Sequence, residues 1–341
     1  MIKVAQIGVG YWGPNLLRNF HFIRDVIVKK VIDINPDRRE YVRQNYKSID
    51  VGGDITEVLE DKDIDAVIIA TPAGLHYEMT KKVLLSNKHC FVEKPLALRS
   101  DEAKELLSIA DKKKLVLMVG HVFLYNTAVN DLRNRILKGD LGRIYYIYSQ
   151  RLNLGKVRND VNVLWNLVPH DISIVLYLLG KNPISVSAVG MSLIQKNIED
   201  VVFMTIKFKD DTIAHFHVSW LDPNKTRMMA IIGSKKMVIY DDISDYKIRI
   251  FNKGIDSGDK DNYLGRFDNS GKFQLIKRAG DIYIPKIEYT EPLKLEAIHF
   301  IDCIKNGKKP RSDGKNGFMV TKIIEFAMKS LKNKSKEVPI W

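Results

Sequence analysis

The sequence contains few cysteines and no long apolar segment. Its 341 residues include two cysteines, Cys90 and Cys303, and neither belongs to a CxxC or CxxH motif. This scarcity argues against a disulfide-stabilised domain, and the scattered histidines lack metal-ligand spacing, so we predict no metal site. No apolar run approaches the roughly 18 residues that span a bilayer, and the N-terminal segment lacks the long apolar stretch of a signal peptide. These absences predict a cytoplasmic protein with no membrane partner.

Acidic residues are also outnumbered, which leaves a formal net charge of +13. Such a charge can attract nucleic acid or an acidic ligand. The lysines are scattered, however, and the densest cluster, Lys112 to Lys114, falls where a helix is expected to end and where cations suit the helix dipole. We therefore expect no nucleic-acid partner. Nucleic-acid binding stays an alternative that heparin retention, not competed by NAD or a UDP-sugar, would support.

Strand-like and helix-like segments alternate through the first part of the chain, and its length suggests two domains. This alternation predicts an α/β domain over residues 1–120, a Rossmann fold with a doubly wound parallel sheet. After Gly120, strand-like segments follow one another with short turns, so residues 121–341 are predicted to form an α+β domain with a largely antiparallel open sheet. The strands expected in the first domain are Lys3 to Ile7, Val26 to Asp33, Ala66 to Ala70, His89 to Val92 and Leu115 to Val119.

A glycine-rich turn follows the first expected strand. Gly8-Val9-Gly10-Tyr11-Trp12-Gly13 fits the G-x-G-x-x-G pattern between a strand and a helix, which is typical of a dinucleotide site. The helix N-terminus then offers N–H groups to the pyrophosphate. Asp33 ends the second strand, where a carboxylate accepts hydrogen bonds from the ribose hydroxyls and disfavours a 2′-phosphate, so we predict NAD rather than NADP. Arg38 and Arg39 lie nearby and keep NADP open as an alternative.

Glu93-Lys94-Pro95 follows the expected strand at His89 to Val92, at a sheet edge where open α/β folds bind ligands. Together with several other motifs, this segment resembles the Gfo/Idh/MocA oxidoreductases along essentially the whole chain. The motifs that carry the resemblance, in order, are Gly8-x-Gly10-x-x-Gly13, Ala70-Thr71-Pro72 with His76, Glu93-Lys94-Pro95, Gly120-His121 with Tyr125-Asn126, and His170.

The resemblance implies that Lys94 lies in the active site beside the nicotinamide and the reacting hydroxyl. It also implies cofactor contacts from Ala70, Thr71, Pro72, His76 and Glu93, in addition to the glycine-rich turn and Asp33. The second domain of such proteins binds the substrate, and its open sheet often contacts another subunit, so we expect a homodimer or homotetramer.

The family usually carries Asp-x-x-x-His at the start of the substrate-binding helix. Here Asn166 replaces the aspartate and His170 matches the histidine; at this spacing both side chains share a helix face. Asp171 is a candidate to replace the missing charge, although it points about 100° away on a helix. The asparagine version resembles the branch of the family that acts at C3 of nucleotide-linked hexoses.

Oxidation of a secondary hydroxyl requires hydride loss to nicotinamide and proton loss from oxygen. A neutral histidine suits the proton step near neutral pH, and an ammonium group stabilises the developing alkoxide. We therefore assign His170 as the base and Lys94 as the electrostatic partner, with exchanged roles as an alternative. Candidate substrate contacts are Lys94, Tyr125, Asn126, Arg151, Lys156, Arg158, Asn166 and His170, because arginines suit bidentate phosphate binding and the polar groups suit sugar hydroxyls.

The leading prediction is an NAD-dependent dehydrogenase of an anionic sugar nucleotide such as UDP-N-acetylglucosamine. Three alternatives stay open. The same chemistry suits a free polyol such as inositol, and the reverse reaction would make the protein a keto-sugar reductase. A Rossmann protein can also be a non-catalytic NAD-binding regulator, although the presence of both Lys94 and His170 argues against that role.

Overall fold

The computed structural model describes residues 1–155, 157–159, 161–256 and 276–341. The chain divides into two compact units. The first comprises Met1–Asn126 and Thr290–Phe326, and the second comprises Thr127–Tyr289 and Ala327–Trp341. The segment at 290–326 therefore packs with the N-terminal unit, whereas the sequence placed the whole of 121–341 in the second domain. Nothing in the local pattern of this segment indicates which sheet its helices cover.

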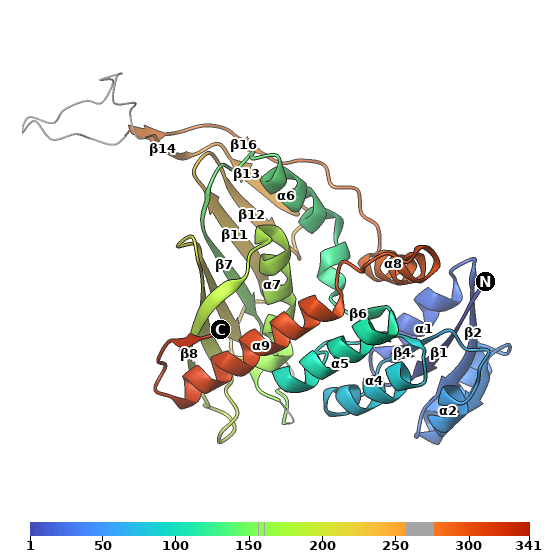
Figure 1. Ribbon diagram of the computed structural model, residues 1–341. Helices are drawn as coiled ribbons and strands as arrows, with labels where there is room; N and C mark the ends of the chain where they lie inside the picture. Colours follow the sequence, from blue (N-terminus) through green and yellow to red (C-terminus); the bar gives the residue numbers. More distant parts are fainter. Residues whose placement is uncertain (156, 160, 257–275) are drawn as a thin grey trace, which may run out of the picture. The chain divides into compact units, whose positions relative to one another are not determined.

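The first unit is built on a six-stranded parallel sheet in the order β3-β2-β1-β4-β5-β6 (Figure 1). This order reverses direction beside β1, and the carboxyl ends of β1 and β4 meet at the point of reversal, where doubly wound sheets bind ligands. The sheet confirms the expected Rossmann domain. Its elements are β1 (Ile2–Ile7), α1 (Gly13–His21), β2 (Val26–Ile32), α2 (Pro36–Asn45), β3 (Asp50–Gly52), α3 (Thr56–Leu59), β4 (Ala66–Ile69), η1 (Ala73–Leu75), α4 (His76–Leu85), β5 (His89–Val92), α5 (Ser100–Lys113), β6 (Leu117–Val119) and η2 (Val122–Tyr125).

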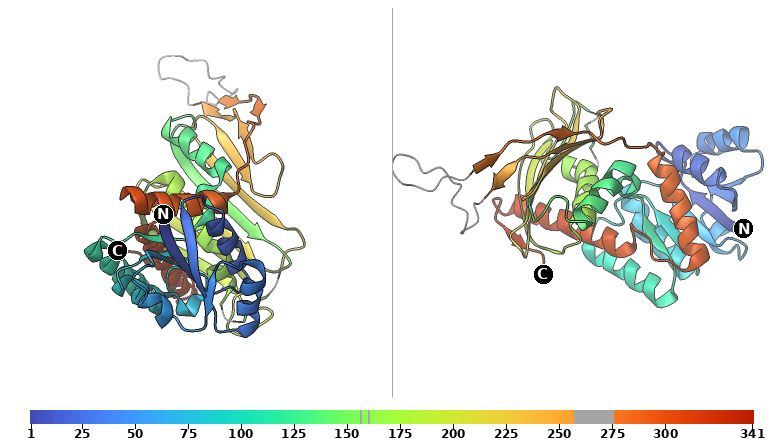
Figure 2. Two further views of the ribbon diagram at one scale, coloured as in Figure 1. Left: turned by 90° about the vertical axis from the view of Figure 1, so that its right-hand side faces the viewer. Right: turned by 90° about the horizontal axis from the view of Figure 1, so that it is seen from above.

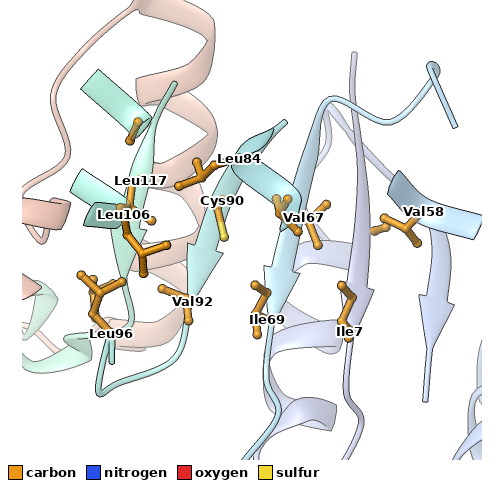
Figure 3. Packing of buried hydrophobic residues seen from close by; sticks show 14 of the residues in the cluster. Ile7, Val58, Val67, Ile69, Leu84, Cys90, Val92, Leu96, Leu106 and Leu117 are labelled. Atoms are coloured by element: carbon orange, nitrogen blue, oxygen red, sulfur yellow. The ribbon is translucent and has the colours of Figure 1, made fainter. Parts of the chain in front are cut away.

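Both faces of this sheet are covered, as the continuous apolar strands predict. On one face, side chains of β4 and β5 pack with those of α4 and α5, and Figure 3 shows Val67, Cys90 and Leu106 in that cluster. On the other face, Phe20 of α1 and Phe91 of β5 make edge-to-face contacts with Phe300 at centroid separations of 5.7–6.1 Å. Phe300 belongs to α8 (Pro292–Asn306), so a helix from near the C-terminus completes the Rossmann core.

The second unit contains a nine-stranded sheet in the order β16-β13-β12-β11-β7-β10-β9-β8-β17. Neighbouring strands are antiparallel except β7 and β10, which run parallel. This confirms the expected largely antiparallel sheet. The elements are α6 (Thr127–Leu137), β7 (Ile144–Leu152), α7 (Val163–Leu179), β8 (Pro183–Met191), β9 (Val201–Phe208), β10 (Ile213–Ser219), β11 (Thr226–Gly233), β12 (Met237–Asp241), β13 (Ile248–Phe251), β14 (Gly254–Asp256), β15 (Ile276–Arg278), β16 (Ile282–Tyr283) and β17 (Val338–Pro339).

One face of the nine-stranded sheet packs against α7 (Figure 2). In β10, Ala214, Phe216 and Val218 are buried on this face, whereas Ile213 and His215 on the opposite face are exposed. Strands with this alternation bury one face and leave the other accessible. The last long helix, α9 (Gly314–Lys332), begins in the first unit and ends in the second. None of the helices in the described ranges is long and apolar enough to cross a membrane.

Candidate active site

The turn between β1 and α1 has the shape that a dinucleotide site requires. Gly8 has a φ of +92°, and a Cβ there would lie 2.6 Å from the Ala70 carbonyl oxygen. A Cβ on Gly13 would lie 2.6 Å from the Gly8 carbonyl oxygen. A Cβ on Gly10, by contrast, would meet no atom within 4 Å. Gly8 and Gly13 are therefore fixed by the fold, while the open space at Gly10 fits a pyrophosphate approaching the backbone.

Asp33 follows β2 and is held beside this turn. Its Oδ2 accepts a hydrogen bond from Val9 N at 2.7 Å, and its Oδ1 accepts one from Asn35 N at 2.8 Å. Arg39 donates from Nη1 to the carbonyl oxygens of Asp33 and Ile34 at 2.9 and 3.0 Å. The Arg39 guanidinium is thus engaged with the backbone that carries Asp33. The open turn and the fixed carboxylate together fit NAD.

Glu93 joins the glycine-rich turn to the loop after β5. Its Oε2 accepts a hydrogen bond from Lys94 N at 3.2 Å, and its carboxylate also accepts one from the Trp12 indole. A Cβ on Gly120 would lie 3.0 Å from the Glu93 carboxyl, so the chain after β6 packs against it as well. Tyr11 is 94% exposed at the tip of the turn. Lys94 is therefore anchored through its own backbone at the edge where β4 and β5 end.

His76 is buried behind these loops rather than directed at a cofactor. It begins α4, and its Nδ1 lies 2.7 Å from the Pro95 carbonyl oxygen while Nε2 lies 2.8 Å from that of Thr71. Burial lowers the pKa of the imidazole, although the two carbonyls oppose this shift. The sequence placed His76 with Ala70, Thr71 and Pro72 in the cofactor site. The structure instead uses it to hold the loop after β4 against the loop after β5.

Tyr125 is likewise buried, contrary to its predicted role as a sugar ligand. It is 2% exposed, and its hydroxyl lies 3.2 Å from Ser312 Oγ. The Arg311 guanidinium packs over its ring at 5.0 Å from the centroid. Because Ser312 and Arg311 follow α8, no local signal near Tyr125 could have revealed these contacts. Asn126 follows it at 9% exposure.

In the second unit, α7 carries the predicted Asn166 and His170 one turn apart. The Asn166 Oδ1 accepts a hydrogen bond at 3.2 Å from the indole of Trp220, the residue that follows β10. The amide oxygen therefore faces Trp220, and the amide nitrogen points away from it. His170 is partly buried, and its carbonyl oxygen accepts a hydrogen bond from Ser173 Oγ at 2.7 Å. An amide in this orientation is a hydrogen-bond donor and cannot take a proton. Of these two side chains, the imidazole of His170 is the one that could accept a proton.

Asp171 faces the sheet and pairs with Arg151 of β7. The guanidinium donates from Nε to Oδ2 at 2.9 Å and from Nη2 to Oδ1 at 2.7 Å, and the two side chains are 7% and 5% exposed. The sequence assigned Arg151 to phosphate binding and considered Asp171 as a replacement for the missing family aspartate. The structure corrects both expectations, because each charge neutralises the other inside the unit.

Of the other predicted phosphate ligands, Arg158 is exposed and accepts a hydrogen bond at its carbonyl oxygen from Gln195 Nε2 at 2.8 Å. Lys156 lies outside the described residues. Across the ranges that the structure describes, no three His, Cys, Asp or Glu side chains are grouped so that they could hold a metal ion.

Comparisons with known families cover most of the chain. Residues 2–121 match an oxidoreductase family with an NAD-binding Rossmann fold, and residues 129–239 match the GFO/IDH/MocA C-terminal domain. The chain belongs to the Gfo/Idh/MocA family. Its first unit is accordingly an NAD-binding Rossmann domain, which confirms NAD as the predicted cofactor. The resemblance inferred from the ordered motifs is confirmed.

Individual relatives of this Gfo/Idh/MocA protein differ in substrate. It is 28% identical to UDP-N-acetylglucosamine 3-dehydrogenase of Acidithiobacillus ferrooxidans over 74% of this chain and 78% of that protein. It is 26% identical to scyllo-inositol 2-dehydrogenase (NAD(+)) of Bacillus subtilis over 91% and 88% of the two chains. The solved structure of the Acidithiobacillus ferrooxidans enzyme matches with a TM-score of 0.81 at 23% identity, covering 98% of this chain and 99% of the other. GenD2 from gentamicin A biosynthesis, solved with NAD, matches with a TM-score of 0.81 at 19% identity over 99% and 96%.

Sequence reasoning missed Glu296, a residue of this Gfo/Idh/MocA protein that lies at the interior of the Rossmann unit. It is 0% exposed, and neither carboxyl oxygen has a hydrogen-bond partner among the described residues. Its position on α8 is more than 200 residues from Glu93 in the sequence, yet the charge of Glu93 acts on it. A glutamate on an otherwise apolar helix face was the available signal, since Ala297, Phe300 and Ile301 are all buried.

Proposed function

We propose that this protein is an NAD-dependent dehydrogenase that oxidises a secondary hydroxyl, at C3, of a nucleotide-linked sugar such as UDP-N-acetylglucosamine. The observation that carries the proposal is the placement of Lys94. It follows β5, and Glu93 and Trp12 connect its loop to the glycine-rich turn of the NAD site. An ammonium group held there suits stabilisation of an alkoxide that develops beside the nicotinamide.

Separate groups of residues bind the cofactor and handle the substrate hydroxyl in the proposed reaction. Bound NAD supplies the hydride acceptor. The open turn at Gly10 and the carboxylate of Asp33 bind and orient it, and His76 keeps the two adjoining loops in place. His170 takes the hydroxyl proton, and Asn166 directs a hydrogen bond at a substrate oxygen. Lys94 stabilises the alkoxide, and an exchange of roles between Lys94 and His170 remains the alternative.

The choice of substrate rests on two supports. Asn166 resembles the nucleotide-sugar branch of the family, and the similarity to UDP-N-acetylglucosamine 3-dehydrogenase points to the same class. The scyllo-inositol relative favours a free polyol as the second candidate. The buried Arg151 leaves Arg158 as the described arginine of this segment that is exposed and suited to phosphate.

The deciding experiment adds NAD with a panel of UDP-sugars, thymidine-diphosphate sugars and free polyols, and follows the NADH absorbance band. A signal with UDP-N-acetylglucosamine or a close relative supports the proposal, and a signal only with polyols moves the protein to the inositol group. No signal despite bound cofactor favours keto-sugar reduction or a non-catalytic role. Lys94→Ala should abolish turnover while NAD still binds, whereas Lys104→Ala on the exposed side of α5 should change neither.

We also propose that two copies of the chain associate through the uncovered face of the nine-stranded sheet. Tyr146 and Ile213 lie opposite each other on β7 and β10 of this face and are 44% and 39% exposed. Val189 on β8 of the same sheet is 51% exposed. Light scattering after gel filtration tests this: the mass of a dimer or tetramer is expected, and Ile213→Arg should reduce it. A monomeric wild type would refute the assembly.

A further inference from the structure

The Rossmann unit contains a cluster of ionisable groups beside Lys94 that the proposed hydride transfer does not use. We call Glu93, His121, Tyr125 and Glu296 the inner cluster. They come from the loops after β5 and β6, from η2 and from α8, and all belong to the same compact unit. Buried polar groups are normally hydrogen-bonded, so the unpartnered ones in this cluster call for an explanation.

Glu93 is the member of the inner cluster that is bonded to the cofactor loops. It is partly accessible, and its carboxylate accepts hydrogen bonds from the Lys94 backbone and from the Trp12 indole. Burial raises the pKa of Glu93 to about 7, against the opposing effects of the Lys94 charge and the two N–H donors. The carboxyl group therefore changes its protonation state near neutral pH.

Glu296 supplies a second carboxyl group that acts on the first. It has no exposed surface, and both of its oxygens lack a hydrogen-bond partner among the described residues. Burial, followed by the charge of Glu93, holds the pKa of Glu296 well above its usual range. A carboxylate without partners in such a place is strongly disfavoured, so Glu296 stays protonated and neutral.

The remaining groups around Glu93 contribute little charge. His121 is 1% exposed, its two ring nitrogens have no partner in the described part of the chain, and burial lowers its pKa to about 3, so it is neutral. Burial also raises the pKa of Tyr125, which stays neutral. The cations that face the cluster are Lys94 and, beside Tyr125, Arg311. Glu93 is therefore the group in the inner cluster that changes charge near pH 7.

We infer that Glu93 couples proton binding to the redox state of the cofactor: its carboxyl group holds less of its proton in the NAD+ complex than in the NADH complex. This inference rests on the proposed placement of the nicotinamide beside Lys94. The oxidised nicotinamide carries a positive charge and favours the carboxylate, whereas the neutral reduced ring shields the carboxyl from water and favours the acid. The pyrophosphate charge is the same in both forms and cancels in the comparison.

Isothermal titration in two buffers of different ionisation enthalpy measures the protons exchanged as each cofactor binds at pH 7, with no sugar present. Because Glu93 titrates near pH 7, binding of NAD+ should leave fewer protons on the protein than binding of NADH, and a single titrating carboxyl limits this difference to at most about one proton. The ratio of the two dissociation constants should then change by at most about tenfold per pH unit near neutrality, with higher pH favouring NAD+. Equal proton counts for the two cofactors would overturn the inference.

Variants assign the effect to its residue. Glu93→Gln should remove the difference between NAD+ and NADH, and Glu296→Gln should preserve it because Glu296 is already neutral. Loss of the difference in Glu296→Gln, but not in Glu93→Gln, would assign the proton to Glu296 and refute our assignment. If Glu93→Gln does not fold, Trp12→Phe decides: loss of the indole donor should move the midpoint of proton exchange to higher pH, and an unchanged midpoint counts against Glu93.

The outcome is independent of the proposed sugar chemistry, since the titrations contain cofactor alone. Binding of both cofactors without a proton difference would end this inference and leave the dehydrogenase proposal intact. A proton difference in a protein that oxidises none of the sugars or polyols would do the reverse.

Discussion

Asp171→Asn should be the most destabilising conservative substitution in the second unit. It keeps the shape of the side chain but leaves the Arg151 guanidinium, which is 7% exposed, without its counter-charge. Removing one partner of a buried ion pair typically costs about 3–5 kcal/mol in the free energy of unfolding, which corresponds to a fall in Tm of about 10 °C for a domain of this size. Urea denaturation followed by circular dichroism and tryptophan fluorescence measures the change.

Two controls make this prediction specific. Lys207 and Glu337 form a pair in the same unit at 2.6 Å, but their side chains are 46% and 44% exposed, so Lys207→Met should change stability by less than about 1 kcal/mol. The double variant Arg151→Met/Asp171→Leu should recover most of the loss, because it removes both buried charges. If Asp171→Asn costs no more than Lys207→Met, the pair is not desolvated and our reasoning is wrong. If the stable double variant loses affinity for a sugar nucleotide, Arg151 is a substrate ligand after all.

Three further predictions concern the two units separately. Glu296→Gln should stabilise the protein at neutral pH. The pKa of the Glu296 carboxyl is raised in the folded state, so the wild-type protein loses stability as the pH rises above the unfolded value of 4.5. The difference in unfolding free energy between variant and wild type should grow by up to about 1.4 kcal/mol per pH unit, and a destabilised variant at pH 8 would mean that Glu296 is ionised. Asn166→Asp places a carboxylate one turn from His170. Because a nearby negative charge raises the histidine pKa, the acidic limb of the plot of kcat/KM against pH should shift upward by about 0.5–1 pH unit. An unmoved limb argues against His170 as the base. Gly10→Ala should leave Tm nearly unchanged and weaken NAD binding at least about tenfold, because a methyl group there enters the open space that fits the pyrophosphate. Gly8→Ala should instead lower Tm. Equal effects of the two substitutions on Tm would contradict the turn geometry.

Local chemistry was sufficient to predict the cofactor half of the protein. The glycine spacing, the carboxylate at Asp33 and the alternation of strands and helices each depend on neighbours within a few residues of one another, and the structure reproduces the turn, the carboxylate and the parallel sheet. The spacing of Asn166 and His170 likewise predicted a shared helix face, and the helix that carries them begins at Val163, where the Asn162 side chain caps it, and continues through Pro169.

The sequence alone therefore determined the fold class, the NAD site and the order of the family motifs, because these are written in short-range spacing. The tertiary structure decided which polar residues are free to act. Arg151 and Asp171 neutralise each other across a strand and a helix, Tyr125 is buried against Ser312, and Glu296 enters the Rossmann core from the far end of the chain. Each of these outcomes depends on contacts between distant segments, and only the folded chain brings such segments within reach.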